Sequence, residues 1–307
     1  MKSNLKFKIK YRFLIPLIIY IFDIIFNTSK KKIKSLSTKP FFIYGSGRNG
    51  STLLASLLNC NENISIPPEQ YVMPYAIMDW KLNKFQSYNK FVNNILRSLS
   101  IKSKTSNWKF DTNNVRQKLL NIPKKQQSLS FIFDCIYNNY DKTKNSIWGD
   151  KTPMNTHFSK YIFSVFPDAN YIFLIRDPRD VVLSYSKMKN HPASKKSYAI
   201  WKWNDSIKSY DFLSKKNNVL IVKYENLVSD TENELERISK YLKVPIKFNS
   251  KFTFESLGVS EQKHHQNLKN PINISSIGKW KNELSENDVS FIVKYTKDNM
   301  ERFGYKI

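Results

Sequence analysis

The sequence predicts an α/β fold in which a central, mainly parallel sheet is covered by helices on both faces. Two observations support this prediction. From Pro40 onward, strand-like and helix-like segments alternate, which is the pattern of parallel strands joined by crossover helices. One strand-like segment, NYIFLI at 170–175, is an apolar run of strand length, as expected for a strand buried on both faces.

The first half of this pattern begins with FFIY at 41–44, a short apolar run that stops at glycines and predicts a strand. STLLASLLN at 51–59 has apolar residues at helical spacing and predicts a helix. The remaining elements expected in this half are a turn that leads into a short helix (67–77), two or three helices in a polar stretch (80–145), and a strand with a following loop (146–153).

In the second half, Asp177 can cap a helix that starts after the strand at 170–175, and Pro178 suits the first turn of that helix. Ser285 and Asp288 predict the capping box of a C-terminal helix. The other expected elements are a helix (155–166), a helix (195–216), a strand (219–224), and an amphipathic helix (230–243) with Leu235, Ile238 and Leu242 facing inward. No boundary or repeat divides 40–307, so we expect one domain there.

Residues 1–39 differ from the rest of the chain. An apolar run at 13–26 has lysines and arginines on both sides, and Pro16 and Asp23 interrupt it. The run is shorter than the roughly 20 apolar residues that a spanning helix needs. Basic flanks suit a peripheral contact with an anionic membrane. We therefore expect a cytoplasmic protein whose tail contacts the inner face of the membrane, with packing of this tail on the domain as the alternative.

The composition is strongly basic, with a net charge of +25 from 50 Lys+Arg against 25 Asp+Glu. Such a balance favours anionic partners, although a lysine-rich solvated surface explains it equally well. We expect no nucleic-acid partner, because no zinc-finger spacing or RNA-binding aromatic motif is present. The two cysteines, Cys60 and Cys135, provide neither a disulfide framework nor a metal cluster.

The segment GSGRNGST at 45–52 allows three interpretations. Its glycines match a dinucleotide fingerprint, with Glu69 as the acidic residue about 20 positions on. They also match most of a nucleotide triphosphatase loop, but Ser51 stands where that loop has lysine. In the third interpretation, the N–H groups of 47–52 at a helix N-terminus bind an anion, helped by the hydroxyls of Ser51 and Thr52 and the charge of Arg48. This interpretation explains the most residues.

A second combination of a cation and a hydroxyl follows the strand at 170–175. Arg176 ends this strand, and Ser184 lies eight residues later in the next helix. Because ligands of open α/β sheets bind at the carboxyl ends of the strands, Arg176 can meet a second phosphate there. The alternative is a structural ion pair, either of Arg176 with Asp180 or of Arg179 with Asp177.

Four motifs in order, GSGRNGSTLL, IRDPRDVVLSYS, VKYENL and GKWKNEL, resemble those of the sulfotransferases that use 3′-phosphoadenosine 5′-phosphosulfate (PAPS). The resemblance covers about residues 41–305. It implies a P-loop-like three-layer sandwich, PAPS as the sulfonyl donor and no metal. The residues that it implies for nucleotide binding are Gly47, Arg48, Asn49, Gly50, Ser51, Thr52, Arg176, Ser184, Tyr224 and Lys279.

Two further segments resemble the tyrosyl-protein and Golgi-type branch of that family. PPEQYVMP implies Glu69 as the catalytic base, and GDKTP implies that Lys151 acts with Arg48 on the transition state. Tyr71 stands where that branch has arginine, and Gly278 stands where it has serine. For these reasons we expect a hydroxyl of a carbohydrate or glycolipid as the acceptor. A tyrosyl-protein sulfotransferase, a P-loop kinase and a non-catalytic anion-binding protein remain as alternatives.

Overall fold

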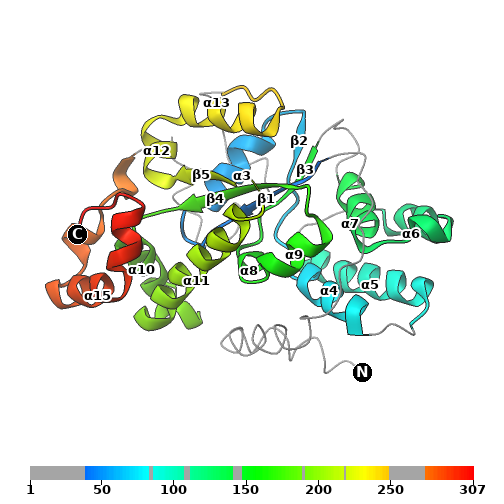
Figure 1. The fold of residues 1–307 in the computed structure, drawn as a ribbon, viewed down its shortest axis with the longest axis horizontal. Coiled ribbons are helices and arrows are strands. Elements are labelled where there is room, and N and C mark those ends of the chain that lie inside the picture. Colours follow the sequence, from blue (N-terminus) through cyan, green and yellow to red (C-terminus); the bar gives the residue numbers. More distant parts are fainter. Residues whose placement is uncertain are drawn as a thin grey trace.

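The computed structural model describes residues 39–82, 86–106, 111–140, 147–188, 191–217, 219–248 and 274–307. A five-stranded sheet lies at the centre, in the order β2-β3-β1-β4-β5, and every neighbouring pair is parallel (Figure 1). Its strands are β1 (Phe41–Tyr44), β2 (Ile64–Ser65), β3 (Ile147–Asp150), β4 (Asn170–Ile175) and β5 (Val219–Lys223). The prediction of a parallel α/β sheet is confirmed.

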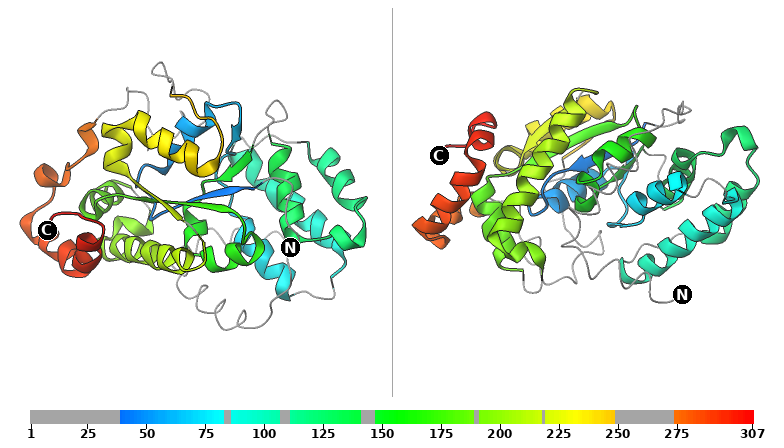
Figure 2. Two further views of the ribbon diagram at one scale, coloured as in Figure 1. Left: turned by 45° about the horizontal axis from the view of Figure 1, so that its top comes forward. Right: turned by 60° about the horizontal axis from the view of Figure 1, so that its bottom comes forward.

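Helices cover both faces of the sheet, which gives the three layers expected from the sequence (Figures 1 and 2). On one face lie α3 (Ser51–Asn59), α12 (Tyr224–Ser229) and α13 (Thr231–Leu242). The other face carries α4 (Met73–Leu82), α9 (Ser159–Val165), α10 (Pro178–Ser186) and α11 (Lys196–Ser214). The remaining helices are α5 (Tyr88–Ser106), α6 (Thr112–Leu120), α7 (Leu129–Asn138), α8 (Pro153–Thr156), α14 (Trp280–Glu283) and α15 (Glu286–Arg302).

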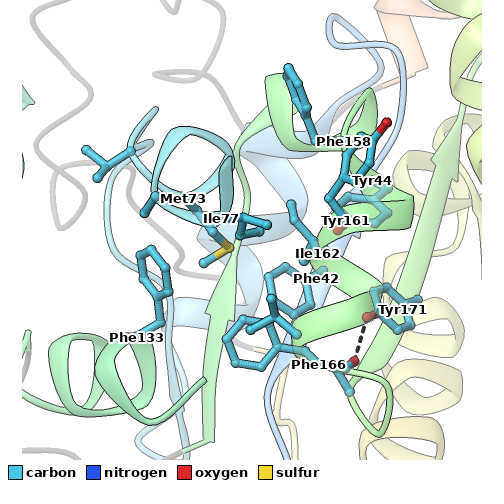
Figure 3. Close-up of a cluster of buried hydrophobic side chains, with 14 of the residues drawn as sticks. Phe42, Tyr44, Met73, Ile77, Phe133, Phe158, Tyr161, Ile162, Phe166 and Tyr171 are labelled. Atoms are coloured by element: carbon cyan, nitrogen blue, oxygen red, sulfur yellow. Dashed lines mark hydrogen bonds between the residues drawn. The ribbon is translucent and has the colours of Figure 1, made fainter. Parts of the chain in front are cut away.

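The alternation of side chains along β1 divides the core between these two faces. Phe41 and Ile43 pack in the cluster that contains α3 and α13. Phe42 and Tyr44 point the opposite way, into the larger cluster (Figure 3). There the Phe42 ring stacks on Tyr171, with ring centroids 5.7 Å apart. A strand with both faces buried is held in one register, because a shift by one residue would exchange the two sets.

Two predicted helix caps are confirmed. Asp177 accepts a hydrogen bond from the Arg179 N–H at 2.8 Å, and Ser285 accepts one from the Asp288 N–H at 3.2 Å. The predicted strand at 219–224 is one residue too long, because Tyr224 already begins α12. The helix predicted at 155–166 is two short helices, α8 and α9.

Residues 1–38 lie outside the described part of the chain, so the expected membrane contact of this tail stays a prediction. Among the described helices, none has the length and apolar character that crossing a membrane requires.

Candidate active site

The strand order places a topological switch point at the carboxyl ends of β1 and β4. These two strands are neighbours, but the chain leaves β1 toward β2 on one side of the sheet and leaves β4 toward β5 on the other. Open α/β sheets bind ligands where the connections diverge in this way. The glycine-rich loop 45–50 follows β1 and Arg176 follows β4, so both predicted anion-binding segments lie at this switch point.

The backbone of the glycine-rich loop turns repeatedly through left-handed conformations. Its φ angles are +77° at Gly47, +56° at Arg48 and +90° at Gly50, which is the N-cap of α3. Successive residues of this kind direct their N–H groups into a shared concavity, and the first turn of a helix adds further N–H donors. For Arg48, a residue with a Cβ atom, the left-handed backbone costs about 1–2 kcal/mol, so the surrounding contacts must hold it in place.

Those contacts join the loop to β4 and α10. The Asn49 side chain is buried, and its Nδ2 donates to the carbonyl of Leu174 at 2.5 Å. The Tyr185 hydroxyl donates to the carbonyl of Ser46 at 2.8 Å. The Asn49 side chain thus positions the loop, while the predicted contact of this residue with nucleotide concerns its backbone N–H group and stays a prediction.

The two predicted phosphate sites adjoin each other. Arg48 Nε donates to the Ser184 hydroxyl at 3.1 Å, and Arg176 Nη1 donates to the carbonyl of Arg48 at 3.2 Å. Burial is the largest cause that lowers the pKa of the Arg48 guanidinium, although an arginine remains charged at neutral pH. The loop after β1 and the end of β4 therefore bring the half-buried Arg48, the buried Arg176 and a hydroxyl into one cluster.

Tyr224 and the segment 276–280 complete the surroundings of Arg176. The Arg176 guanidinium lies over the Tyr224 ring, 4.4 Å from its centroid, and donates to the carbonyl of Ser276 at 2.5 Å. The Tyr224 hydroxyl and the Ser276 hydroxyl are 2.5 Å apart. Lys279, which is half-buried, belongs to the same segment. The late basic segment thus lies beside Arg176, as the sequence predicted.

The two ion pairs considered as structural alternatives differ in strength. Arg179 Nη2 is 2.7 Å from the Asp177 carboxylate, so the structural interpretation fits Arg179. Arg176 is 3.7 Å from Asp180, whose oxygens already accept the N–H groups of Gly278 and Trp280 at 2.8 and 3.1 Å. Asp180 mainly anchors the late segment, so this pair does not explain the position of Arg176.

A second cluster lies between α3 and the loops that precede α4 and α8. Lys151 Nζ donates to Glu69 Oε1 at 2.6 Å and is 3.5 Å from the hydroxyl of Thr52 in the first turn of α3. The Tyr71 hydroxyl donates to the other Glu69 oxygen at 2.9 Å. Three residues that the sequence proposed separately, Glu69, Lys151 and Thr52, therefore form one chain of contacts that ends at the glycine-rich loop.

A family model described as the sulfotransferase family matches residues 40–248. The chain belongs to the sulfotransferase family. Its sequence is 23% identical over 258 residues to the protein-tyrosine sulfotransferase of Drosophila melanogaster, covering 79% of this chain and 47% of that protein. It is also 23% identical to protein-tyrosine sulfotransferase A of Caenorhabditis elegans, covering 87% of this chain and 68% of the relative. The chain thus spans about half the length of the fly protein.

The structural comparison agrees with this family assignment at the level of the fold. The sulfotransferase domain from the Synechococcus PCC 7002 olefin synthase superimposes with a TM-score of 0.59 at 19% identity, and the match covers 90% of this chain and 100% of that domain. The P-loop-like arrangement predicted from the sequence, with a glycine-rich loop between β1 and α3, is therefore that of a known sulfotransferase domain.

Sequence reasoning missed the buried network that supports the Glu69 segment. The fully buried Gln70 donates to the Tyr137 hydroxyl at 2.9 Å, and Tyr137 donates to Asp150 at 2.6 Å. Asp150 also accepts the Thr152 hydroxyl at 3.1 Å, and Thr152 in turn accepts the Gln70 N–H at 3.3 Å. The available signal was Asp150 itself, an acidic residue at the end of a buried strand.

Proposed function

We propose that this chain transfers the sulfonyl group of PAPS to the phenolic hydroxyl of a protein tyrosine. The observation that carries the proposal is the pair of contacts made by Glu69. One of its oxygens is bound by Lys151, which reaches toward the glycine-rich loop, and the other accepts a hydrogen bond from a phenol. A carboxylate placed between the donor loop and a phenol is what a general base for phenol sulfation requires.

PAPS suits the cluster of Arg48, Arg176 and Ser184 for two reasons. The cluster is positively charged, and it offers two places for the anionic groups of the nucleotide. The N–H groups of 47–52, with the hydroxyls of Ser51 and Thr52, would bind the 5′-phosphosulfate. Arg176 and Ser184 would bind the 3′-phosphate, with Lys279 on the adjoining segment and the Tyr224 ring beside Arg176. This assignment gives the half-buried Arg48 and the buried Arg176 an anionic partner each, which offsets part of the cost of removing their charges from water.

The chemistry divides among Glu69, Lys151 and Arg48. The acceptor oxygen attacks sulfur, the bond from sulfur to the bridging oxygen breaks, and the bisphosphate nucleotide leaves. Glu69 takes the acceptor proton, and Lys151 and Arg48 stabilise the negative charge that grows on the bridging oxygen. The burial of Lys151, whose side chain is 10% exposed, strengthens this stabilisation because little water competes for the charge.

The carbohydrate acceptor expected from the sequence has less support than the tyrosyl alternative. The curated relatives matched over most of this chain are named protein-tyrosine sulfotransferases. The expectation rested partly on Tyr71 replacing an arginine, yet the Tyr71 hydroxyl hydrogen-bonds to the proposed base. A position that places a phenol beside Glu69 is compatible with a phenolic acceptor.

The test is transfer from radiolabelled PAPS to a panel of acceptors. We expect label on an acidic peptide that contains tyrosine, and none on the same peptide with phenylalanine or on oligosaccharides. Glu69→Gln should lower turnover about 10²–10⁴-fold while leaving nucleotide affinity nearly unchanged. The matched control is Glu62→Gln, because Glu62 is exposed and only seven positions away.

Label on the oligosaccharides instead of the tyrosine peptide would refute the acceptor assignment. ATP hydrolysis that depends on Mg²⁺, without binding of the bisphosphate nucleotide, would refute the sulfotransferase chemistry and favour the kinase alternative.

A further inference from the structure

Tyr71 occupies the position that a phenolic acceptor should take. Its hydroxyl is 2.9 Å from Glu69 Oε2, within the 2.6–3.2 Å that a general base needs from the proton it removes. The hydroxyl donates its proton toward the carboxylate, which is the orientation of a nucleophile about to be deprotonated. The side chain is half-buried, so the phenol lies at the border between the site and solvent.

The same hydrogen-bonded chain orients this phenol relative to the sulfonyl donor. Lys151 binds Glu69 Oε1 at 2.6 Å and approaches the Thr52 hydroxyl at 3.5 Å. Thr52 lies in the first turn of α3, directly after the glycine-rich loop, so Lys151 and Glu69 link the Tyr71 hydroxyl to the segment that we assign to the sulfonyl donor. In the proposed transfer, Lys151 would stabilise the leaving group and Glu69 would take the acceptor proton.

The backbone that carries Tyr71 is held firmly. Gln70 is fully buried, and its Oε1 accepts the N–H groups of Val72 and Met73 at 2.7 and 3.1 Å. Its own N–H donates to Thr152. Because both the backbone and the side chain of Gln70 are hydrogen-bonded inside the protein, its two neighbours, Glu69 and Tyr71, are held close to each other. The contact between them therefore follows from the buried network and does not depend on a mobile loop.

We propose that Tyr71 is itself a sulfation site, so that the chain sulfates its own Tyr71 when no other acceptor is bound. This inference rests on the proposed function. The Tyr71 oxygen attacks the sulfur of PAPS, its proton passes to Glu69, and the bond from sulfur to the bridging phosphate oxygen breaks. The products are O-sulfated Tyr71 and the bisphosphate nucleotide, so no further reactant is needed.

The modified side chain would close the acceptor position. A sulfate ester on Tyr71 carries a negative charge, and Lys151 and Arg48 supply positive charge at the same site. An incoming acceptor would then meet an occupied, negatively charged position. Self-sulfation should therefore lower the rate at which the chain later sulfates a peptide, and peptide present from the start should compete with self-sulfation.

The experiment incubates the full chain with radiolabelled PAPS and no acceptor, and then maps the label by peptide mass spectrometry. We expect one sulfonyl group per chain, on Tyr71, with an initial rate per chain that does not change with protein concentration. Tyr71→Phe and Glu69→Gln should each lose this label. Tyr75→Phe is the matched control, since Tyr75 is a half-buried tyrosine four residues away, and it should label as the native chain does.

Each alternative result overturns the inference in a recognisable way. Efficient sulfation of an external tyrosine peptide without label on Tyr71 would refute self-sulfation and leave the proposed function intact. Label that persists in Tyr71→Phe, or a rate per chain that rises in proportion to protein concentration, would assign the reaction to another site or to a second copy. Absence of both activities would refute the inference together with the proposed function.

Discussion

Replacement of Gly50 by alanine tests whether the glycine-rich loop and the Tyr224 ring are packed so tightly that neither can shift without the other. Gly50 caps α3 with a φ of +90°, and a Cβ atom there would lie 2.2 Å from Cδ2 and 2.6 Å from Cε2 of Tyr224. The ring cannot absorb this contact alone, because it lies against the Arg176 guanidinium and its hydroxyl is bound by Ser276. A methyl group at 50 therefore displaces the arginine that we assign to the 3′-phosphate.

Two effects lower the unfolding free energy of Gly50→Ala, and a control variant allows them to be measured separately. The left-handed backbone costs an alanine about 1–2 kcal/mol. Overpacking against a held ring adds about 1–3 kcal/mol. Gly278→Ala supplies the first part alone, since its φ is +70° and its added Cβ would meet nothing nearer than the flexible Lys281 side chain at 3.8 Å. The expected difference between the two variants is thus about 1–3 kcal/mol of unfolding free energy.

Urea unfolding measures this difference, and titration with the bisphosphate nucleotide measures its consequence for the site. We expect Gly50→Ala to be less stable than Gly278→Ala and to bind the nucleotide at least about tenfold more weakly than the native chain, as a loss of 1.4 kcal/mol implies. Equal stability of the two variants, with native nucleotide affinity in Gly50→Ala, would refute the coupling of loop, ring and arginine.

Three further predictions concern single side chains. Arg48→Ala should lower kcat/KM about 10²–10³-fold in the transfer assay, because a half-buried charge that we assign to the leaving group is lost; a loss below about threefold would contradict its role. Arg176→Ala should weaken binding of the bisphosphate nucleotide about 10–100-fold and abolish discrimination against the 3′-dephospho analogue, as titration of both ligands would show; preserved discrimination would exclude it from the 3′-phosphate site. Burial lowers the pKa of His157, which stacks on Trp201 and hydrogen-bonds to Asp205, so the fold holds it neutral. Its contribution to stability should therefore be present above about pH 6.5 and decline below it by at most about 1.4 kcal/mol per pH unit. Thermal unfolding of His157→Phe should show a flatter acid limb than the native chain.

The parts of the fold that the sequence predicted are those set by local pattern. FFIY predicted β1, because a run of four apolar residues that stops at glycines has the length and composition of a strand buried on both faces. Asp177 predicted the start of α10, because its carboxylate can cap a helix N-terminus and the following Pro178 suits the first helical turn. The contact of Arg48 with Ser184 was not predicted, because the two residues are 136 positions apart and the sequence assigned them to different phosphate groups of one nucleotide.

The parts that could not be predicted depend on contacts distant in sequence. Gln70 bonds to a tyrosine 67 positions away, and its N–H bonds to a threonine 82 positions away. No local pattern marks a glutamine as the anchor of a loop, because glutamine is common at exposed positions. Asn49 is a similar case: the sequence placed its N–H group in the anion-binding loop, but it gave no sign that the side chain bonds to the carbonyl of Leu174 on β4.

Tyr71 shows why a substitution in a motif is weak evidence about an acceptor. From the sequence, tyrosine in place of arginine argued against a tyrosine substrate, because it departs from the pattern of the tyrosyl-protein branch. In the structure, the same residue hydrogen-bonds to Glu69, the base that we propose. Position 71 therefore contacts Glu69 through a neutral hydroxyl. A contact of this kind suits a phenol as well as other hydroxyl groups, so the exchange itself excludes no class of hydroxyl acceptor.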